Sequence, residues 1–339
     1  MLNRHSLATK ALASAPVILM LLAALTLAGG QAEAAGNEYT MISIPKLRSE
    51  WFNRLEWGLQ QAGAEFGVKV SQQAPASADE AQQVRLIEDA INQGNNAILV
   101  VPNDANSVVP VFTRAQRRGI AIITHESPNQ QFANYDVEMI DNVAFGEKAL
   151  EVMVEAMGTT EGKFVIFVGS LTVPAHNVWA DAALDLAKRK YPGLIEVASR
   201  FPVAEDQNLA RQTALDILTT YPDIKGFLTF GSQGAPGVAQ ALREKGLVGK
   251  VAVVGTPTPN QARQYLKDGS MSAAVLWDPA EAGWAMVYLA KTVLDGRANE
   301  IGPDFEIPGL GKPMTVNGNT LIFDRPLIVT KDNVDQYNF

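Results

Sequence analysis

The sequence of 339 residues contains no cysteine and only three histidines. Without cysteine the chain has no disulfide, no thiolate metal ligand and no cysteine nucleophile. It also lacks the cysteine at which a lipid-anchored bacterial protein is cleaved and modified. His5 lies near the start of the chain, and His125 and His176 are far apart in sequence. Neither belongs to an HExxH or histidine-rich motif, so we expect no metal site.

Motifs of common enzymes are also missing. There is no G-x-S-x-G elbow, no GxxxxGK[ST] loop and no GxGxxG motif after the first predicted strand. Residues 231–234 (GSQG) resemble an elbow only superficially, because the first glycine is adjacent to the serine. Carboxylates are plentiful, but only Glu126, Asp141 and Asp278 stand at predicted strand ends. We therefore expect no enzymatic activity and no cofactor.

Long basic runs are absent as well. The formal net charge is −8, and no run of lysine and arginine is longer than residues 188–190 (KRK). An acidic surface disfavours binding to nucleic acid and to anionic lipid. Hydrophobic residues make up 47% of the chain and charged residues 19%, which is typical of a globular protein with room for two domains.

The first 35 residues read as a secretory signal peptide. Arg4 and Lys10 provide a basic region, residues 15–28 (APVILMLLAALTLA) an apolar core, and residues 32–34 (AEA) a cleavage site. The apolar run is shorter than the roughly 20 residues that span a bilayer. The alternative is an uncleaved membrane anchor. We expect export to the periplasm and cleavage near Ala35, without a lipid anchor.

Short apolar runs alternate with amphipathic stretches from residue 39 onward. In the first half the predicted strands are 39–44, 68–71, 97–101 and 120–124, and the predicted helices are 50–66, 78–93 and 107–118. Gly67, Gly94 and Gly119 stand where these helices should end. Strand–helix alternation predicts a parallel sheet with helices on both faces.

The same pattern restarts in the second half. Here the predicted strands are 163–168, 195–199, 226–229, 251–254 and 273–276, and the predicted helices are 178–191, 209–220 and 237–245. No linker of proline or serine separates the halves. Two α/β lobes joined in this way suggest several chain crossings and a cleft between them. In open parallel sheets, ligands bind beyond the carboxyl ends of the strands.

In the first half, polar and aromatic residues gather at those strand ends. Trp51 and Phe52 follow the first strand and predict a stacking surface for a sugar ring, although both could instead pack under the following helix. Lys46 could donate to ligand oxygens or remain a solvated loop residue. Glu126 could accept two hydroxyl hydrogens of a diol, or could serve as a helix cap or surface residue.

The second half repeats this arrangement. His176 and Asn177 begin a helix next to a large aromatic residue, and Asn177 has capping as its alternative role. Asp278 could equally be the N-cap of a helix that begins near Glu281. The other candidates also follow strands; they are Phe230, Ser232, Gln233, Thr256 and Trp277. Aromatic, amide, hydroxyl and carboxylate groups without a nucleophile–base pair predict recognition of a polyol rather than its conversion.

Five stretches carry a resemblance to a known family. They are 44–47 (IPKL), 92–98 (NQGNNAI), 254–260 (VGTPTPN), 276–278 (LWD) and 331–339 (KDNVDQYNF). The whole chain after the signal resembles the type I periplasmic binding proteins of sugar ABC importers, and within them the subgroup that binds autoinducer-2 or rhamnose.

The resemblance implies roles for individual residues. Lys46 matches the lysine that grips the autoinducer, and Glu126 falls where the family uses aspartate. Trp51 and Phe52 match the aromatic pair that stacks on the sugar in ribose-type binders, and Trp277 falls at a ligand-contacting position. Two stretches depart from the autoinducer binder: residues 175–176 are Ala-His in place of Asp-Gln, and residues 230–232 are Phe-Gly-Ser in place of Pro-Asp-Ala. These departures favour a pentose, a deoxyhexose or a sugar alcohol.

The resemblance also implies an organisation and a function. Two Rossmann-like lobes, 36–146 with about 278–308 and 147–277 with about 309–339, would close around a ligand and deliver it to a membrane permease. We expect a monomer. The alternatives are an autoinducer-2-like signal receptor, a periplasmic sensor subunit and a secreted α/β enzyme; a LacI-type regulator is excluded, because the chain lacks a basic helix-turn-helix.

Overall fold

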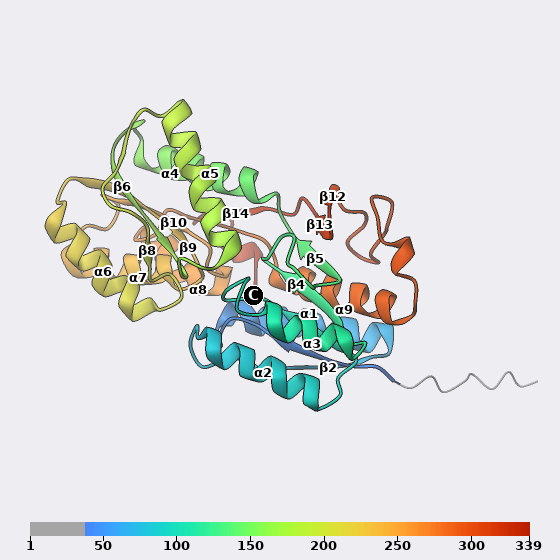
Figure 1. Ribbon diagram of the computed structural model, residues 1–339. Coiled ribbons are helices and arrows are strands. Elements are labelled where there is room, and N and C mark those ends of the chain that lie inside the picture. Colours follow the sequence, from blue (N-terminus) through green and yellow to red (C-terminus); the bar gives the residue numbers. More distant parts are fainter. Residues whose placement is uncertain (1–37) are drawn as a thin grey trace, which may run out of the picture. The chain divides into compact units, whose positions relative to one another are not determined.

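The computed structural model describes residues Glu38–Phe339, which form two parallel-type sheets (Figure 1). The predicted signal peptide lies outside the described residues. In the first sheet the strands run in the order β12-β13-β5-β4-β3-β1-β2. Their bounds are β1 Thr40–Ile44, β2 Lys69–Gln72, β3 Ala97–Val100, β4 Ala121–His125, β5 Tyr135–Glu138, β12 Thr315–Asn317 and β13 Thr320–Ile322.

The second sheet has the order β14-β11-β10-β9-β6-β7, and the short β8 pairs with β6. Its strands are β6 Glu161–Val168, β7 Gly193–Glu196, β8 Phe201–Pro202, β9 Ile224–Phe230, β10 Ala252–Gly255, β11 Ala273–Leu276 and β14 Leu327–Val329. Among the described strands, β12 pairs antiparallel with β13 and β14 with β11, and the other pairs are parallel. Central strands such as β3 and β10 are buried along their whole length, as expected for parallel strands covered on both faces.

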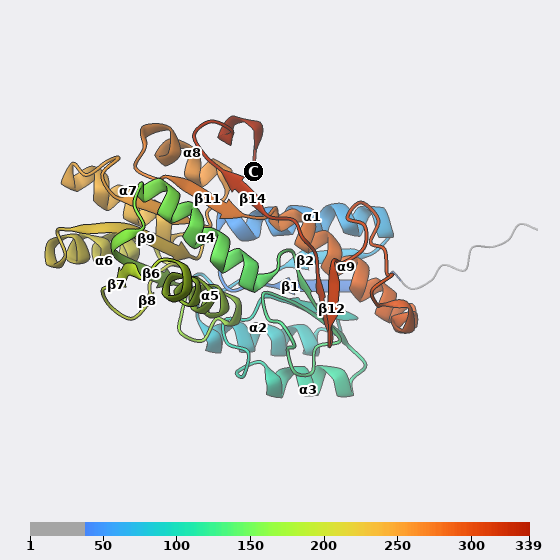
Figure 2. The same ribbon diagram turned by 90° about the horizontal axis from the view of Figure 1, so that it is seen from above.

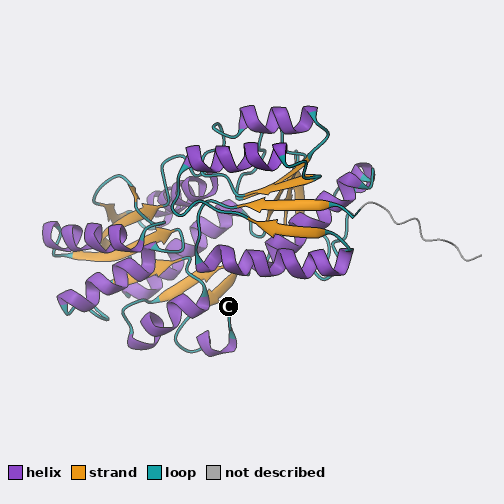
Figure 3. Cartoon of the chain, turned by 90° about the horizontal axis from the view of Figure 1, so that it is seen from below, coloured by secondary structure: helices purple, strands orange, loops and turns teal. Residues whose placement is uncertain are grey.

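Helices cover both faces of each sheet (Figure 3). On the first sheet α1 (Glu50–Phe66) packs beside α9 (Pro279–Leu294), and α2 (Glu80–Asn92) packs beside α3 (Val109–Arg117) on the other face. We call this sheet and its four helices the first lobe. The remaining helices belong to the second lobe: α4 Asn142–Met157, α5 Pro174–Lys190, α6 Gln207–Thr220, α7 Gly234–Lys245 and α8 Pro259–Asp268. Of these, α4 packs against α5, and α6 against α7 (Figure 2).

The chain passes between the lobes three times. The crossings follow β5, β11 and β13, and they run together, because the Phe323 N–H donates to the Glu138 carbonyl and the Arg325 N–H to the Met139 carbonyl. The expectation that residues from about 309 onward belong to the second lobe is wrong for the first part of this segment. β12 and β13 extend the first sheet, because β13 pairs with β5, and the chain changes lobe only between Ile322 and Leu327.

One apolar cluster is shared by both lobes. It runs from α1 through Trp51, Trp277 and Trp179 into the second sheet. A second cluster lies under α2 and α3 and belongs to the first lobe alone. The predicted helix ends at Gly67, Gly94 and Gly119 all have positive φ, which glycine adopts without strain. The shared cluster places large aromatic side chains where the carboxyl ends of the two sheets face each other.

Close contact between α1 and α9 leads to a prediction. A Cβ added at Gly58 would lie 2.0 Å from the carbonyl oxygen of Ala280. Gly58→Ala must therefore push the helices apart, and overpacking of this kind costs about 1–3 kcal/mol of unfolding free energy. Urea denaturation measures the loss. Gly302→Ala is the control, since a Cβ there meets nothing within 4 Å. Equal stability of the two variants would contradict the close helix contact.

Candidate functional site

A small cavity lies between the lobes, at the carboxyl ends of the strands. We call it the inner cavity. It leaves about 10 Å³ for the centres of water molecules, room for roughly one. Anything larger can enter only when the lobes separate or the lining side chains move. The lining consists of Lys46, Trp51, Phe52, Glu126, His176, Trp179, Glu205, Gly231, Ser232, Thr256 and Trp277.

Lys46 lies at the centre of a buried ionic network. Its Nζ is 2.7 Å from Glu126 Oε2, 3.3 Å from Glu205 Oε1 and 2.9 Å from His176 Nε2. The side chains of Lys46, Glu126 and Glu205 are only 2%, 3% and 6% exposed. Lys46 and Glu126 belong to the first lobe, whereas His176 and Glu205 belong to the second. The network therefore links the lobes through one ammonium group.

The network keeps Lys46 and Glu126 charged despite burial. Burial opposes the ammonium form, but Glu126 and Glu205 outweigh it and raise the pKa of Lys46. Burial likewise opposes the carboxylate form of Glu126, yet the Lys46 charge and a hydrogen bond with His176 hold the pKa of Glu126 well below its usual range. A charged pair of this kind offers a strong donor and a strong acceptor to any polar molecule that enters.

His176 differs, because it is held neutral. Burial and the neighbouring Lys46 ammonium lower the pKa of His176 below its ordinary value. The Gly169 N–H donates to Nδ1, while Nε2 faces the network, 2.9 Å from Lys46 Nζ. The ring also stacks on Trp179, with centroids 5.0 Å apart. His176 thus enters the inner cavity as a neutral ring whose position is fixed by Gly169 and Trp179.

Aromatic rings form the rest of the wall. Trp277 meets Trp51 edge-on at 5.0 Å and Trp179 edge-on at 5.6 Å between centroids. The indole nitrogen of Trp277 is buried and makes no hydrogen bond within the described residues. Phe52 adds a further ring, 5.9 Å from Lys46 Nζ. Ring faces beside charged groups suit a molecule with apolar C–H faces and polar edges.

The backbone at Glu126 is unusual for a residue with a side chain. Its φ is 58°, in the left-handed region that non-glycine residues seldom adopt. Such a conformation costs about 1–3 kcal/mol and persists where the surroundings enforce it, often at functional sites. Here it accompanies the turn after β4 that brings the carboxylate to Lys46. The strain thus coincides with the residue that holds the ammonium group.

The structure brings eight predicted site residues together around the inner cavity: Lys46, Trp51, Phe52, Glu126, His176, Ser232, Thr256 and Trp277. Trp51 and Phe52 lie in the first turn of α1 and are buried, at 5% and 2% exposed, and they still contribute to the lining. The burial of this pair is observed, whereas its role as a stacking surface stays a prediction. Whether each residue contacts a ligand stays a prediction.

Four predicted site residues do not line the inner cavity. Asn177 donates to the carbonyls of Ser170 and Val173, and Phe230 packs in the core against Trp179. Asp278 caps α9 and binds Arg54 through both carboxylate oxygens. Gln233 donates to Ser232 Oγ and faces a neighbouring pocket. In the first three, local capping, apolar packing or a salt bridge took the side chain away from the cavity.

Three lining residues were not predicted. Trp179 follows His176 by three residues in α5, and this helical spacing places it on a nearby face. Glu205 follows β8, a strand of two residues that has no hydrophobic pattern to reveal it. Gly231 carries no side-chain chemistry; its φ of 138° lets the backbone pass close to Ala204. Of these three residues, only Trp179 could have been predicted from the sequence.

Behind the inner cavity lies a second group of buried carboxyls. Burial, together with the nearby Asp136 and Glu126 charges, raises the pKa of Glu138 well above its ordinary value of 4.5. Burial also raises the pKa of Asp136, against hydrogen bonds from Thr124 and Ser127. Neither oxygen of Glu138 makes a hydrogen bond among the described residues. Glu138 therefore stays protonated in the folded protein at pH values where the unfolded chain ionises it.

This difference predicts a pH dependence of stability. A raised folded-state pKa means that stability is lost as pH rises above 4.5, at up to about 1.4 kcal/mol per pH unit until the folded pKa is reached. Glu138→Gln removes that term, so its stability relative to the natural protein should rise between pH 5 and pH 8. Urea midpoints at both pH values measure it, with Glu244→Gln on the surface as control. A constant difference would show that Glu138 is ionised when folded.

Two α/β lobes with a buried cavity at their facing strand ends define a two-lobed binding protein. Residues 41–298 match a family model described as a periplasmic binding protein domain, and the chain belongs to this family. This confirms the family expected from the sequence and its fold class. The family is one of binding proteins, which agrees with the expectation that the chain is not an enzyme.

Individual proteins of known name are similar to the chain. The chain is 29% identical over 258 residues to the D-allose-binding periplasmic protein of Escherichia coli (strain K12), covering 74% of this chain and 82% of that protein. It is 24% identical to the ribose import binding protein RbsB of Bacillus subtilis (strain 168), covering 77% and 83%. Among solved structures, LsrB from Clostridium saccharobutylicum in complex with AI-2 has a TM-score of 0.83 at 26% identity, covering 88% of this chain and all of that one.

Proposed function

We propose that this chain is a solute-binding protein that captures a small sugar or polyol between its lobes and delivers it to an ABC importer permease. The observation that carries the proposal is the inner cavity, where a buried Lys46–Glu126 pair lies among four aromatic rings. Relatives named for allose, ribose and xylitol binding support this ligand class. Each of these ligands is a small polyhydroxyl compound.

In this proposal the ligand takes over part of the ionic network. Its ring faces stack on Trp51 and Trp277, while Glu126 accepts hydroxyl hydrogens and Lys46 donates to ligand oxygens. His176 and Ser232 complete the contacts from the second lobe. Since the inner cavity has room for about one water, binding requires opening at the three crossings, a hinge motion. An unpaired buried hydroxyl costs about 1–3 kcal/mol, so each polar group must be matched.

The location belongs to the same proposal. Residues 1–35 have the composition of a signal peptide, and relatives of the chain are named as periplasmic proteins. Within Glu38–Phe339, no helix has the length and apolar character needed to cross a bilayer. We propose that the chain acts in the periplasm as a monomer and meets its permease at the membrane surface.

A second candidate is an autoinducer-2-like signal receptor. The structural similarity to LsrB with AI-2 favours it, as does a lysine at position 46. Ala175 and His176 oppose it, because that pair replaces the Asp-Gln pair of autoinducer binders. Ala175 is buried and offers no polar group to the ligand.

A thermal-shift screen tests both candidates. The protein from residue 36 onward is unfolded and refolded to remove carried ligand, then mixed with D-allose, D-ribose, D-xylose, xylitol, L-rhamnose or autoinducer-2. Ligand at 100 times its Kd adds about 2.7 kcal/mol and raises Tm by several degrees. A strong shift with a sugar or with xylitol supports the first candidate. A shift with autoinducer-2 alone supports the second, and no shift at all contradicts both.

A further inference from the structure

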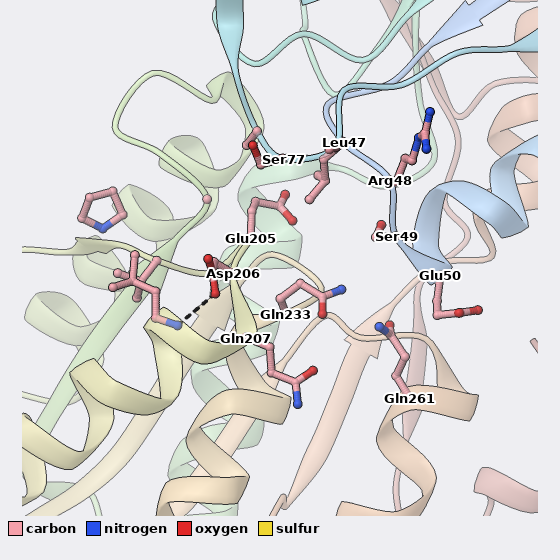
Figure 4. A pocket seen from close by; sticks show the side chains of 16 residues that line it. Leu47, Arg48, Ser49, Glu50, Ser77, Glu205, Asp206, Gln207, Gln233 and Gln261 are labelled. Atoms are coloured by element: carbon pink, nitrogen blue, oxygen red, sulfur yellow. Dashed lines mark hydrogen bonds between the residues drawn. The ribbon is translucent and has the colours of Figure 1, made fainter. Parts of the chain in front are cut away.

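A pocket larger than the inner cavity lies beside it, and we call it the outer pocket (Figure 4). Its volume is about 560 Å³, within the usual range for small-molecule sites. The first lobe contributes the segments 47–50 and 76–78, and the second lobe contributes residues after β6, β8, β9 and β10. The outer pocket therefore lies between the lobes, as the inner cavity does.

Three glutamines from the second lobe form one wall of the outer pocket. Gln207 begins α6, Gln233 precedes α7 and Gln261 lies in the first turn of α8. Figure 4 shows them grouped below Glu205, opposite the loop that carries Ser49. The Gln261 oxygen is engaged in the capping box of α8, and the Gln233 nitrogen donates to Ser232. An amide nitrogen of Gln261 and an amide oxygen of Gln233 are left to face the pocket.

Glu205 stands at the junction, because it lines both cavities. Its Oε1 is 3.3 Å from Lys46 Nζ, while its Oε2 is buried and makes no hydrogen bond among the described residues. Leaving a buried carboxylate oxygen without a donor is costly. Glu205 Oε2 is thus an acceptor without a donor, and it lies where a molecule in the inner cavity would extend into the outer pocket.

The lining also indicates what the outer pocket accepts. Arg48 is its only cation among the described lining residues, against the carboxylates Glu50, Glu205 and Asp206. This excess of negative charge disfavours phosphates and sugar acids. The described lining contains no aromatic ring, in contrast to the inner cavity. Amides and carboxylates without a stacking surface suit a neutral unit recognised through its hydroxyl groups.

We propose that the outer pocket holds the second unit of a neutral disaccharide or glycoside whose first unit occupies the inner cavity. Glu205 Oε2 accepts a hydroxyl hydrogen near the glycosidic linkage, and Gln207, Gln233 and Gln261 bind the hydroxyls of the outer unit. This inference rests on the proposed function, since it assigns the inner cavity to a sugar. It extends the ligand class from single sugars to two-unit compounds.

Titration calorimetry with matched sugars tests it. The protein is titrated with D-xylose and xylobiose, L-arabinose and arabinobiose, and D-glucose and cellobiose. We expect one disaccharide to bind at least tenfold more tightly than its own monosaccharide. The inference is overturned, with the proposed function intact, if no disaccharide shows this gain, whether the pairs bind equally or only a sugar of the thermal-shift panel binds. No binding of any of the six sugars, together with no shift in the thermal-shift panel, would overturn both.

Two variants test whether the additional affinity for the disaccharide comes from the outer pocket. Gln207→Ala should remove at least tenfold of the affinity for the disaccharide and leave the monosaccharide within twofold, because Gln207 does not line the inner cavity. Gln212→Ala on the same helix is the matched control, since Gln212 is exposed outside both cavities. Ser77→Trp, which fills the outer pocket from an exposed loop, should have the same selective effect. Equal loss of both sugars in either variant would contradict the assignment.

Discussion

Lys46→Met should lower the unfolding free energy by about 3–5 kcal/mol at pH 7. The change removes the ammonium that Glu126 and Glu205 share and leaves two carboxylates in a site that is almost closed to water. Breaking a buried ion pair by removing one partner has costs of this size, because the remaining charge is no longer compensated. Urea denaturation of the protein and the variant measures the difference.

The pH dependence of that loss identifies its cause. In the natural protein the pKa of Glu126 is depressed, so its stabilising contribution is present above pH 4.5 and is lost as pH falls below that value. Without Lys46, burial raises the pKa of Glu126 instead, and stability is then lost as pH rises. The gap between the two proteins should therefore widen from pH 4 to pH 8. Lys190→Met, which breaks the exposed pair with Glu151, should change little at any pH. A gap independent of pH would mean that Lys46 acts by packing alone.

Glu126→Ala should weaken binding of the sugar that gives the largest thermal shift by well over tenfold. The variant removes the acceptor of the ligand hydroxyls and leaves Lys46 with Glu205 as its only carboxylate partner. An unpaired buried hydroxyl alone costs about 1–3 kcal/mol, and each 1.4 kcal/mol is a factor of ten. Titration calorimetry gives the two dissociation constants.

Two further variants separate this effect from a general loss of structure. Glu126→Gln keeps the shape and one acceptor oxygen, so its affinity should lie between that of the natural protein and that of Glu126→Ala. Glu244→Ala, on the exposed surface of α7, should bind normally. Unchanged affinity of Glu126→Ala would show that Glu126 does not bind the ligand. Its contact with Lys46 would then be structural.

The fold was predictable because its pattern is local. Buried parallel strands read as short apolar runs, and α1 and β11 have the bounds that the pattern predicts. The predicted elements do not include α4, α8, β5, β8 and β12 to β14. Two of these, β5 and β8, lack a hydrophobic pattern. β5 (YDVE) carries buried carboxyls that disguise it as a polar segment, and β8 is only two residues long. Hydrophobic periodicity does not reveal a strand of either kind.

The site was predictable only in its types of residue. Strand ends in a parallel sheet meet at one edge, so Lys46, Glu126 and Trp277 could be expected near one another. The same rule could not exclude Asn177 and Asp278, since a side chain at the start of a helix can cap it locally or turn toward a distant partner. Asp278 turned to Arg54, 224 positions away in sequence.

The sequence by itself determined the class of the protein: a chain without cysteine or catalytic motifs, two α/β halves, and polar and aromatic residues after successive strands. The tertiary structure decided which charged and polar side chains contact one another. Lys46 meets Glu205 and His176 only because three chain crossings bring the two sheets face to face. The strength of an ion pair depends on distance and burial, and neither quantity can be read from spacing along the chain. The outer pocket likewise exists only in three dimensions, since its walls come from segments of both lobes.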